Sequence, residues 1–150
     1  MGFETLSNEK IFDNAIVVDN SVSMRWLFDD GSDGDRKYAQ KILKIIESQA
    51  HSAIVPYLWI YESAFVVNFY ATKQQLDDGE CRSHLDSLMD LFSVVVAREQ
   101  PSSLFDFCQT YSLSAYDSAY LLLAQQQRCP IATLDKKMKK VARKIEITIL

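Results

Sequence analysis

The chain has 150 residues, of which 48% are hydrophobic and 24% are charged, and its formal net charge is −4. These values are typical of one globular domain and exclude a wholly disordered chain. The acidic balance also argues against strong non-specific binding to nucleic acid.

The apolar pattern predicts short, uniformly apolar strands that alternate with helices. In chain order we expect strand 15–18, helix 22–28, a loop at 29–35, helix 36–49, strand 53–55, helix 57–75, helix 77–92, strand 93–96, helix 102–111, helix 114–127, strand 131–134, helix 136–143 and strand 147–149. Such an order favours a parallel sheet that is covered on both faces. No repeat or linker divides the sequence, so we expect a single α/β domain over residues 1–150.

The cysteines and the apolar segments indicate a cytoplasmic protein with no membrane contact. Cys81, Cys108 and Cys129 are odd in number and widely spaced, which is typical of free thiols in a reducing compartment. No signal peptide is recognisable. The apolar stretch 53–71 approaches membrane-spanning length but contains Glu62, so we interpret it as part of the core.

Positive charge is concentrated near the end of the sequence. Residues 136–150 contain six Lys or Arg and one acid, whereas the rest contains ten Lys or Arg and nineteen acids. Such a segment could contact phosphates or an acidic partner, or it could be the solvated face of a short helix. Charge alone leaves both interpretations open.

Glu62 is the only formally charged residue between Glu47 and Lys73. It lies well inside the predicted helix 57–75, among aromatic and aliphatic neighbours. A carboxylate in such surroundings must be protonated, paired with a cation or bound to a metal ion. No Lys or Arg is near it in sequence, so the structural alternative is a pairing with a distant cation.

Three further acids lie where a ligand site is expected in an open α/β sheet, at the carboxyl ends of the strands. Asp19 follows the first strand, Asp135 follows the fourth, and Asp117 lies in the first turn of the helix before the fourth strand. If these strands are neighbours, the carboxylates converge on one edge of the sheet and Glu62 reaches it from its helix. Each acid also has a structural alternative, because Asp19 and Asp135 could cap helices and Asp117 could complete a capping box with Ser114.

Clustered carboxylates repel one another, by roughly 4 kcal/mol for a pair about 4 Å apart at an effective dielectric of about 20. Mg²⁺ or Mn²⁺ relieves this repulsion and prefers all-oxygen ligands, whereas Zn²⁺ favours His and Cys. With phosphate substrates such an ion activates water, so we expect phosphodiester hydrolysis. Ser21 and Thr133 each lie two residues from an acid and could orient a carboxylate or a water. Helix capping for Ser21 and core packing for Thr133 are their alternatives.

Four segments of the chain resemble the PIN domain, most closely the VapC-type toxins of bacterial toxin–antitoxin pairs. The segments are Ile16-Val17-Val18-Asp19-Asn20-Ser21, Tyr61-Glu62, Leu113-Ser114-Ala115-Tyr116-Asp117-Ser118-Ala119-Tyr120-Leu121 and Ile131-Ala132-Thr133-Leu134-Asp135. The resemblance spans essentially the whole chain. The family's acidic quartet falls on Asp19, Glu62, Asp117 and Asp135, and its hydroxyl after the first acid falls on Ser21.

The resemblance implies a three-layer α/β/α sandwich around a five-stranded parallel sheet of order 3-2-1-4-5. It also implies a Mg²⁺- or Mn²⁺-dependent endoribonuclease that hydrolyses RNA with a metal-activated water, forms a homodimer and is inhibited by a cognate antitoxin protein. The chain departs from the family at one point. Where the family often has an Asn one helical turn after the Glu, this chain has Phe65 and Val66, and its Asn is Asn68.

Two other functions remain open from the sequence. The first is a non-catalytic PIN-like scaffold that binds RNA or protein, although a scaffold has no need of clustered like charges. The second is an aspartyl phosphotransfer domain with Asp19 as the nucleophile. Haloacid-dehalogenase-type enzymes of that kind have a second acid at the position where this chain has Ser21.

Overall fold

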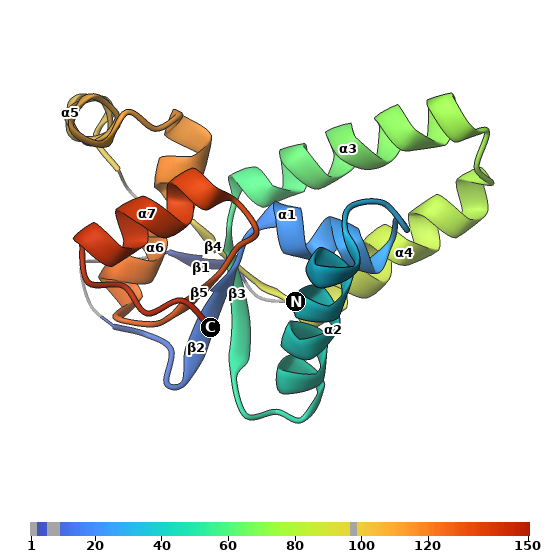
Figure 1. Ribbon diagram of the computed structural model, residues 1–150, viewed down its shortest axis with the longest axis horizontal. Helices are drawn as coiled ribbons and strands as arrows, with labels where there is room; N and C mark the ends of the chain where they lie inside the picture. The colour runs from blue at the N-terminus through green and yellow to red at the C-terminus, as the bar shows by residue number, and fades with distance from the viewer. Residues whose placement is uncertain (1–2, 6–9, 97–98) are drawn as a thin grey trace.

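The structure is a computed structural model that describes residues 3–5, 10–96 and 99–150 (Figure 1). Its elements in chain order are β1 (Phe3–Thr5), β2 (Ala15–Val18), α1 (Asn20–Ser23), the 3-10 turn η1 (Met24–Trp26), α2 (Asp33–Glu47), β3 (Ser52–Pro56), α3 (Leu58–Gln74), α4 (Asp78–Leu91), β4 (Ser93–Val96), α5 (Pro101–Tyr111), α6 (Ala115–Gln127), β5 (Ile131–Ala132) and α7 (Lys136–Lys144). None of the helices in this part of the chain has the length and hydropathy that a membrane span requires.

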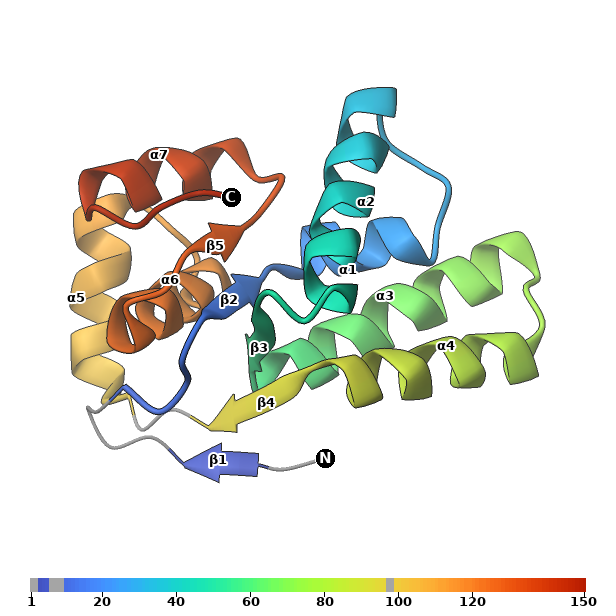
Figure 2. The ribbon, with the colours of Figure 1, turned by 90° about the horizontal axis from the view of Figure 1, so that it is seen from below.

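The elements form three layers with the sheet in the middle (Figure 2). Helices α5, α6 and α7 lie on one side of the sheet, and α1, α2, α3 and α4 lie on the other. All four residues of β2 are buried, as expected for a central strand of a parallel sheet with both faces covered. The predicted α/β architecture with a covered parallel sheet is confirmed.

The described strands pair in parallel, in the order β1-β4-β3-β2-β5. The predicted strands 93–96, 53–55, 15–18 and 131–134 correspond to β4, β3, β2 and β5. The expected order of these four strands is therefore correct, and β2 lies beside β5. The edge strand β1 is not predicted, because its sequence is short and mixed in polarity.

The sheet differs from the prediction at the β5 edge. The expected strand 147–149 forms one isolated parallel bridge, between Ile131 and Ile149, so it does not count as the fifth strand. β5 itself stops at Ala132, two residues earlier than predicted. The cause is that the next free N–H groups, those of Leu134 and Asp135, donate to side-chain hydroxyls and not to a neighbouring strand.

The helices follow the predicted pattern except after β2. There the expected helix 22–28 begins two residues earlier, at Asn20, and tightens into the 3-10 turn η1 after Ser23. The ends of the other six helices lie within three residues of the predicted ones. The polypeptide therefore turns into α1 directly from the end of β2.

Helix α3 packs against α1 and α4, and its buried residues Trp59, Ser63 and Val67 repeat every four residues on one face. Trp59 is fully buried, and its indole N–H donates to Ser23 Oγ at 3.2 Å. Its ring also packs edge-on against Phe92. This anchor fixes the rotation of α3 about its axis and thereby the direction in which Glu62 leaves the helix.

We predict that Trp59→Ala destabilises the fold by about 3–5 kcal/mol, because it removes a large fully buried side chain and leaves a cavity. Equilibrium urea unfolding measures this loss. Asn68→Ala is the control, since Asn68 lies on the exposed side of the same helix and its loss should cost no more than about 0.5 kcal/mol. Similar losses in the two variants would contradict the assigned rotation of α3.

Candidate active site

Asp19 lies at the carboxyl end of β2, where its backbone N–H donates to the Ala132 carbonyl of β5 at 2.9 Å. Since the strand register pairs Val18 with Ala132, Asp19 lies level with Thr133. Asp19 is only 5% exposed, and its Oδ2 accepts hydrogen bonds from Ser21 Oγ at 2.6 Å and Thr133 Oγ1 at 2.8 Å. It occupies the N-cap position of α1 but makes no capping bond, so helix capping does not explain this residue.

Both hydroxyls that bond Asp19 are themselves held by backbone donors. Ser21 Oγ accepts from the N–H of Leu134 at 3.1 Å, and Thr133 Oγ1 accepts from the N–H of Asp135 at 3.1 Å. Because each hydroxyl accepts from the backbone, its single proton is free to point at Asp19. These bonds tie the chain after β5 to the carboxylate after β2.

Glu62 is half-buried on α3, and its Oε1 accepts a hydrogen bond of 2.6 Å from the hydroxyl of Tyr120. Tyr120 is fully buried on α6. No Lys or Arg of the described residues forms an ion pair with Glu62, so pairing with a distant cation does not explain it. Burial raises the pKa of Glu62 to about 7; the Tyr120 bond opposes this rise, and the charges of Asp19 and Asp117 add to it.

Asp117 lies in the first turn of α6, where its N–H donates to the side chain of Ser114 at 3.0 Å. Within the described residues no donor bonds its carboxylate, so the reciprocal half of a capping box does not form. Its negative charge contributes to raising the pKa of both Asp19 and Glu62. Asp19, Glu62 and Asp117 are therefore close enough to interact at this edge of the sheet.

Asp135 stands apart from the other three acids. It is exposed, it is the N-cap of α7, and its Oδ1 accepts from the N–H of Met138 at 2.7 Å. Helix capping, the structural alternative given for Asp135, therefore accounts for its conformation. Its backbone still belongs to the site, because its N–H donates to Thr133 Oγ1.

The donor set fits a hard divalent cation in its chemistry, although it is not closed around a metal position. Among the residues that the structure describes, no three His, Cys, Asp or Glu side chains are gathered tightly enough to hold an ion. The available donors are carboxylate oxygens, and burial, with a smaller contribution from Asp117, raises the pKa of Asp19 against its hydroxyl bonds. Mg²⁺ keeps several waters and uses one or two protein carboxylates, so a site with few carboxylate ligands is compatible with it.

Apart from Glu62, the residues of the pocket at this site were not singled out by the sequence as site residues. Asn20, Glu62 and Val66 line an open pocket together with three exposed aromatic residues, Tyr61, Phe65 and Tyr116. Tyr120 could have been found, because it lies three residues after Asp117 and shares a helix face with it.

Asn68, the asparagine that this chain has farther along the helix than the family pattern places it, is exposed on α3 and does not line this pocket. The pocket residue with an amide side chain is Asn20, which is buried at the start of α1.

Comparisons with known proteins agree with this arrangement. A family model described as the PIN domain matches residues 16–144. The crystal structure of PAE2754 from Pyrobaculum aerophilum is similar over 88% of this chain and 89% of that one, with a TM-score of 0.63 and 16% identity. The crystal structure of FitAcB from Neisseria gonorrhoeae is similar over 90% of this chain and 96% of that one, with a TM-score of 0.61 and 16% identity. No curated protein matches the sequence significantly.

We predict that Tyr120→Phe raises the pKa of Glu62 further, by about one unit, because it removes a hydrogen bond that favours the ionised carboxylate. Carbon-13 NMR titration of the glutamate carboxyl groups, without divalent metal, measures this value. Tyr116→Phe should leave it unchanged, since Tyr116 is exposed on the same helix. A lowered or unchanged pKa in Tyr120→Phe would contradict the described contact.

Proposed function

We propose that this chain, which belongs to the PIN domain family, is an endoribonuclease that depends on Mg²⁺ or Mn²⁺ and hydrolyses RNA phosphodiester bonds. PIN domains are typically metal-dependent nucleases. The observation that carries the proposal is the electrostatic coupling of Asp19, Glu62 and Asp117, with no cation paired to Glu62 among the described residues. A domain with only a structural role gains nothing from this repulsion.

Asp19, Glu62, Asp117 and Asp135 are the proposed metal-binding and catalytic residues. Bound there, a hard divalent cation would supply charge stabilisation for the phosphate and a more acidic water. Ser21 and Thr133 engage Oδ2 of Asp19, so the other carboxylate oxygen is left for the ion. Asp135 would join the site only after release of its capping bond to Met138, or through an intervening water.

Glu62 is the residue best suited to handle a proton. Its pKa of about 7 means that both protonation states are populated near neutral pH, which is the condition that favours general base catalysis. The Tyr120 hydroxyl holds Oε1, so that Oε2 is the oxygen available to orient and deprotonate a water.

A non-catalytic PIN-like scaffold is the second candidate, and the position of Asp135 is what favours it. Asp135 is exposed and engaged in capping α7, and the described residues contain no closed metal group. A scaffold would bind RNA or protein at the same edge of the sheet without cleaving it.

We further propose that the protein is the toxin of a toxin–antitoxin pair, acts in the cytoplasm, and comprises one PIN domain over residues 1–150. The support is the sequence resemblance to VapC-type toxins. Under this proposal a cognate antitoxin protein, encoded as a separate chain, would block the site. The three cysteines of the chain are free thiols, as a reducing compartment would require.

We propose a homodimer that forms through the outer face of α3. Tyr61, Phe65 and Phe69 repeat there every four residues and are 68%, 72% and 51% exposed. Large exposed aromatic residues that gather on one helix face are typical of the centre of a protein interface. A second copy of the chain is the occupant we infer, because a two-fold interface uses the same face twice and such a stripe is complementary to itself.

We predict that the natural chain cleaves single-stranded RNA with Mg²⁺ or Mn²⁺ and not in excess chelator, and that Asp19→Asn lowers the rate by at least about 100-fold. Gel analysis of labelled RNA fragments measures the rate. Asp86→Asn is the control, since Asp86 is an exposed acid on α4 and carries the same charge change. RNA binding without cleavage under all these conditions would favour the scaffold, and cleavage in chelator would refute the metal dependence.

We predict that sedimentation velocity finds a dimer for the natural chain and a monomer for Tyr61→Ser/Phe65→Ser, because the double change removes the most exposed aromatic groups of α3. Ile11→Ser is the control, since Ile11 is an exposed apolar residue outside this helix. Far-UV circular dichroism checks that the variants remain folded. A dimer that persists in the folded double variant would place the contact elsewhere.

A further inference from the structure

Two helices beside the site carry lysines on neighbouring faces. On α2, Lys37, Lys41 and Lys44 are exposed and lie at intervals of four and three residues, which aligns them along one stripe. On α7, Lys136 and Lys140 are exposed at a four-residue interval, and Lys139 is half-buried next to them. We name these residues the basic band: Lys37, Lys41, Lys44, Lys136, Lys139 and Lys140.

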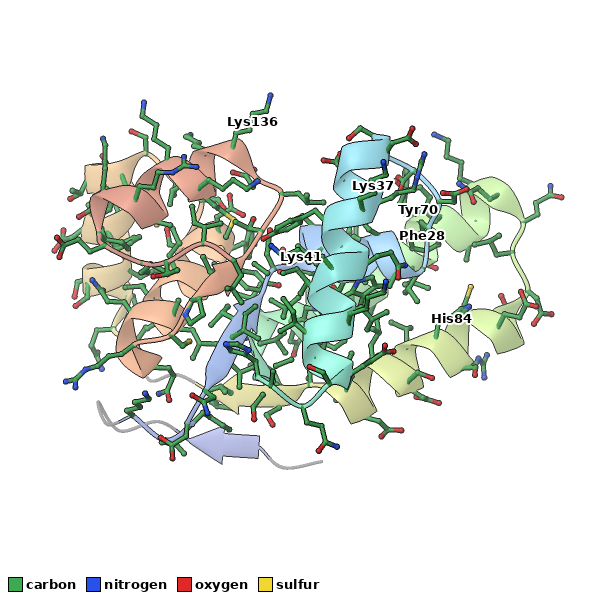
Figure 3. All side chains as sticks on the ribbon, turned by 60° about the horizontal axis from the view of Figure 1, so that its bottom comes forward. Phe28, Lys37, Lys41, Tyr70, His84 and Lys136 are labelled. Atoms are coloured by element: carbon green, nitrogen blue, oxygen red, sulfur yellow. The ribbon has the colours of Figure 1, made fainter. Side chains whose placement is uncertain are left out.

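The two halves of the basic band are joined through Tyr38. The ammonium group of Lys139 lies 5.3 Å from the centre of the Tyr38 ring, and the Tyr38 hydroxyl donates to the carbonyl of Leu150 at 2.6 Å. Lys37 and Lys41 flank Tyr38 on α2, and Figure 3 shows Lys136 at the start of the adjacent α7. The lysines of α2 and α7 therefore form one surface.

One end of this surface borders the carboxylates, whereas Lys44 lies at the other end, in the last turn of α2. Lys136 directly follows Asp135, the acid that caps α7. On the α2 side, burial raises the pKa of Tyr38, and the negative charge of Asp19 adds to this rise, which places Tyr38 within electrostatic range of the site. A chain that crosses the carboxyl edge of the sheet would meet lysines on both helices.

No lysine of the basic band forms an ion pair with an acid among the residues that the structure describes. Within the described residues, ion pairs involve only arginines as cations, Arg25 with Asp30 and Arg36 with Asp29 and Asp33. The segregation is pronounced because the chain as a whole is acidic, with a net charge of −4. Unpaired lysines gathered on one face of an acidic protein create a local positive potential that attracts an anionic ligand.

We propose that the basic band binds the phosphate backbone of single-stranded RNA beside the scissile bond, an inference that rests on the proposed ribonuclease function. The carboxylates repel the polyanion that they would act on, so the affinity must come from another surface. Lysines spaced about 6 Å and about 4.5 Å apart along the axis of α2 provide a row of point charges that can follow a flexible backbone without reading its bases. Binding of an acidic protein partner would not explain why the basic band borders the site.

Fluorescence anisotropy tests the basic band with a short single-stranded RNA of mixed sequence and Asp19→Asn protein, in chelator, over a series of salt concentrations. Lys37→Gln/Lys41→Gln and Lys136→Gln/Lys140→Gln remove two charges each from its two halves. The matched control, Lys10→Gln/Lys73→Gln, removes two exposed lysines outside the band. Circular dichroism confirms that all variants fold.

We expect each band variant to lose two phosphate contacts. The slope of log affinity against log salt then falls by about 1.4, and the affinity falls about 25-fold at 0.1 M monovalent salt, whereas the control changes little. Equal losses in band and control variants, or none, would overturn the inference. A band variant that keeps its RNA affinity but loses binding to polyglutamate would also overturn the inference, because that result would indicate an acidic protein partner.

The same measurements separate this inference from the proposed function. If the natural chain cleaves RNA while the band variants bind it like the control, the band is not the RNA surface and the ribonuclease proposal stands. If the band variants lose RNA binding but the natural chain does not cleave, the band is an RNA surface on a scaffold. In that case the proposed ribonuclease function fails and the binding surface remains.

Discussion

The burial of the Asp19 carboxylate between two hydroxyl groups is the interaction on which the arrangement of the site depends. Ser21 Oγ and Thr133 Oγ1 both donate to Asp19, and each accepts a backbone N–H from the segment that follows β5. The same bonds end β5 and direct the chain into α7. An acid with so little access to water remains in place because hydrogen bonds offset part of its desolvation. Fold and electrostatics are therefore linked at one residue.

The other two acids of the coupled group, Glu62 and Asp117, have no cation partner among the described residues. Glu62 has a tyrosine hydroxyl as its partner and Asp117 has no donor to its carboxylate, so among the described residues their charges are not neutralised by a cation. Together with Asp19 they form a local concentration of negative charge beside a band of lysines. A divalent ion and a polyanionic substrate would complete this distribution, the ion at the carboxylates and the phosphates along the lysines. This division of charge is the physical basis of the proposed function.

Much of this arrangement could be predicted from the sequence, because it depends on local patterns. Apolar runs located four of the five strands, β2 to β5, and an isolated acid in the apolar helix 57–75 identified Glu62. What could not be predicted depends on contacts between distant segments. Three features follow only from the way in which distant segments pack: Tyr120 as the partner of Glu62, the single bridge at Ile149 and the edge strand β1. The conformation of Asp135 is a further example, since a cap residue and a metal ligand have the same sequence signature.

The central claim is that a hard divalent ion relieves the repulsion among these carboxylates, and thermal unfolding with increasing Mn²⁺ tests it most directly. The account predicts that Mn²⁺ stabilises the natural chain by about 2.7 kcal/mol at a hundredfold excess over Kd. For a domain of this size the melting temperature would rise by roughly 5–10 °C. Asp19→Asn should show little of this rise. A melting temperature that does not respond to Mn²⁺, or responds equally in Asp19→Asn, would contradict the account.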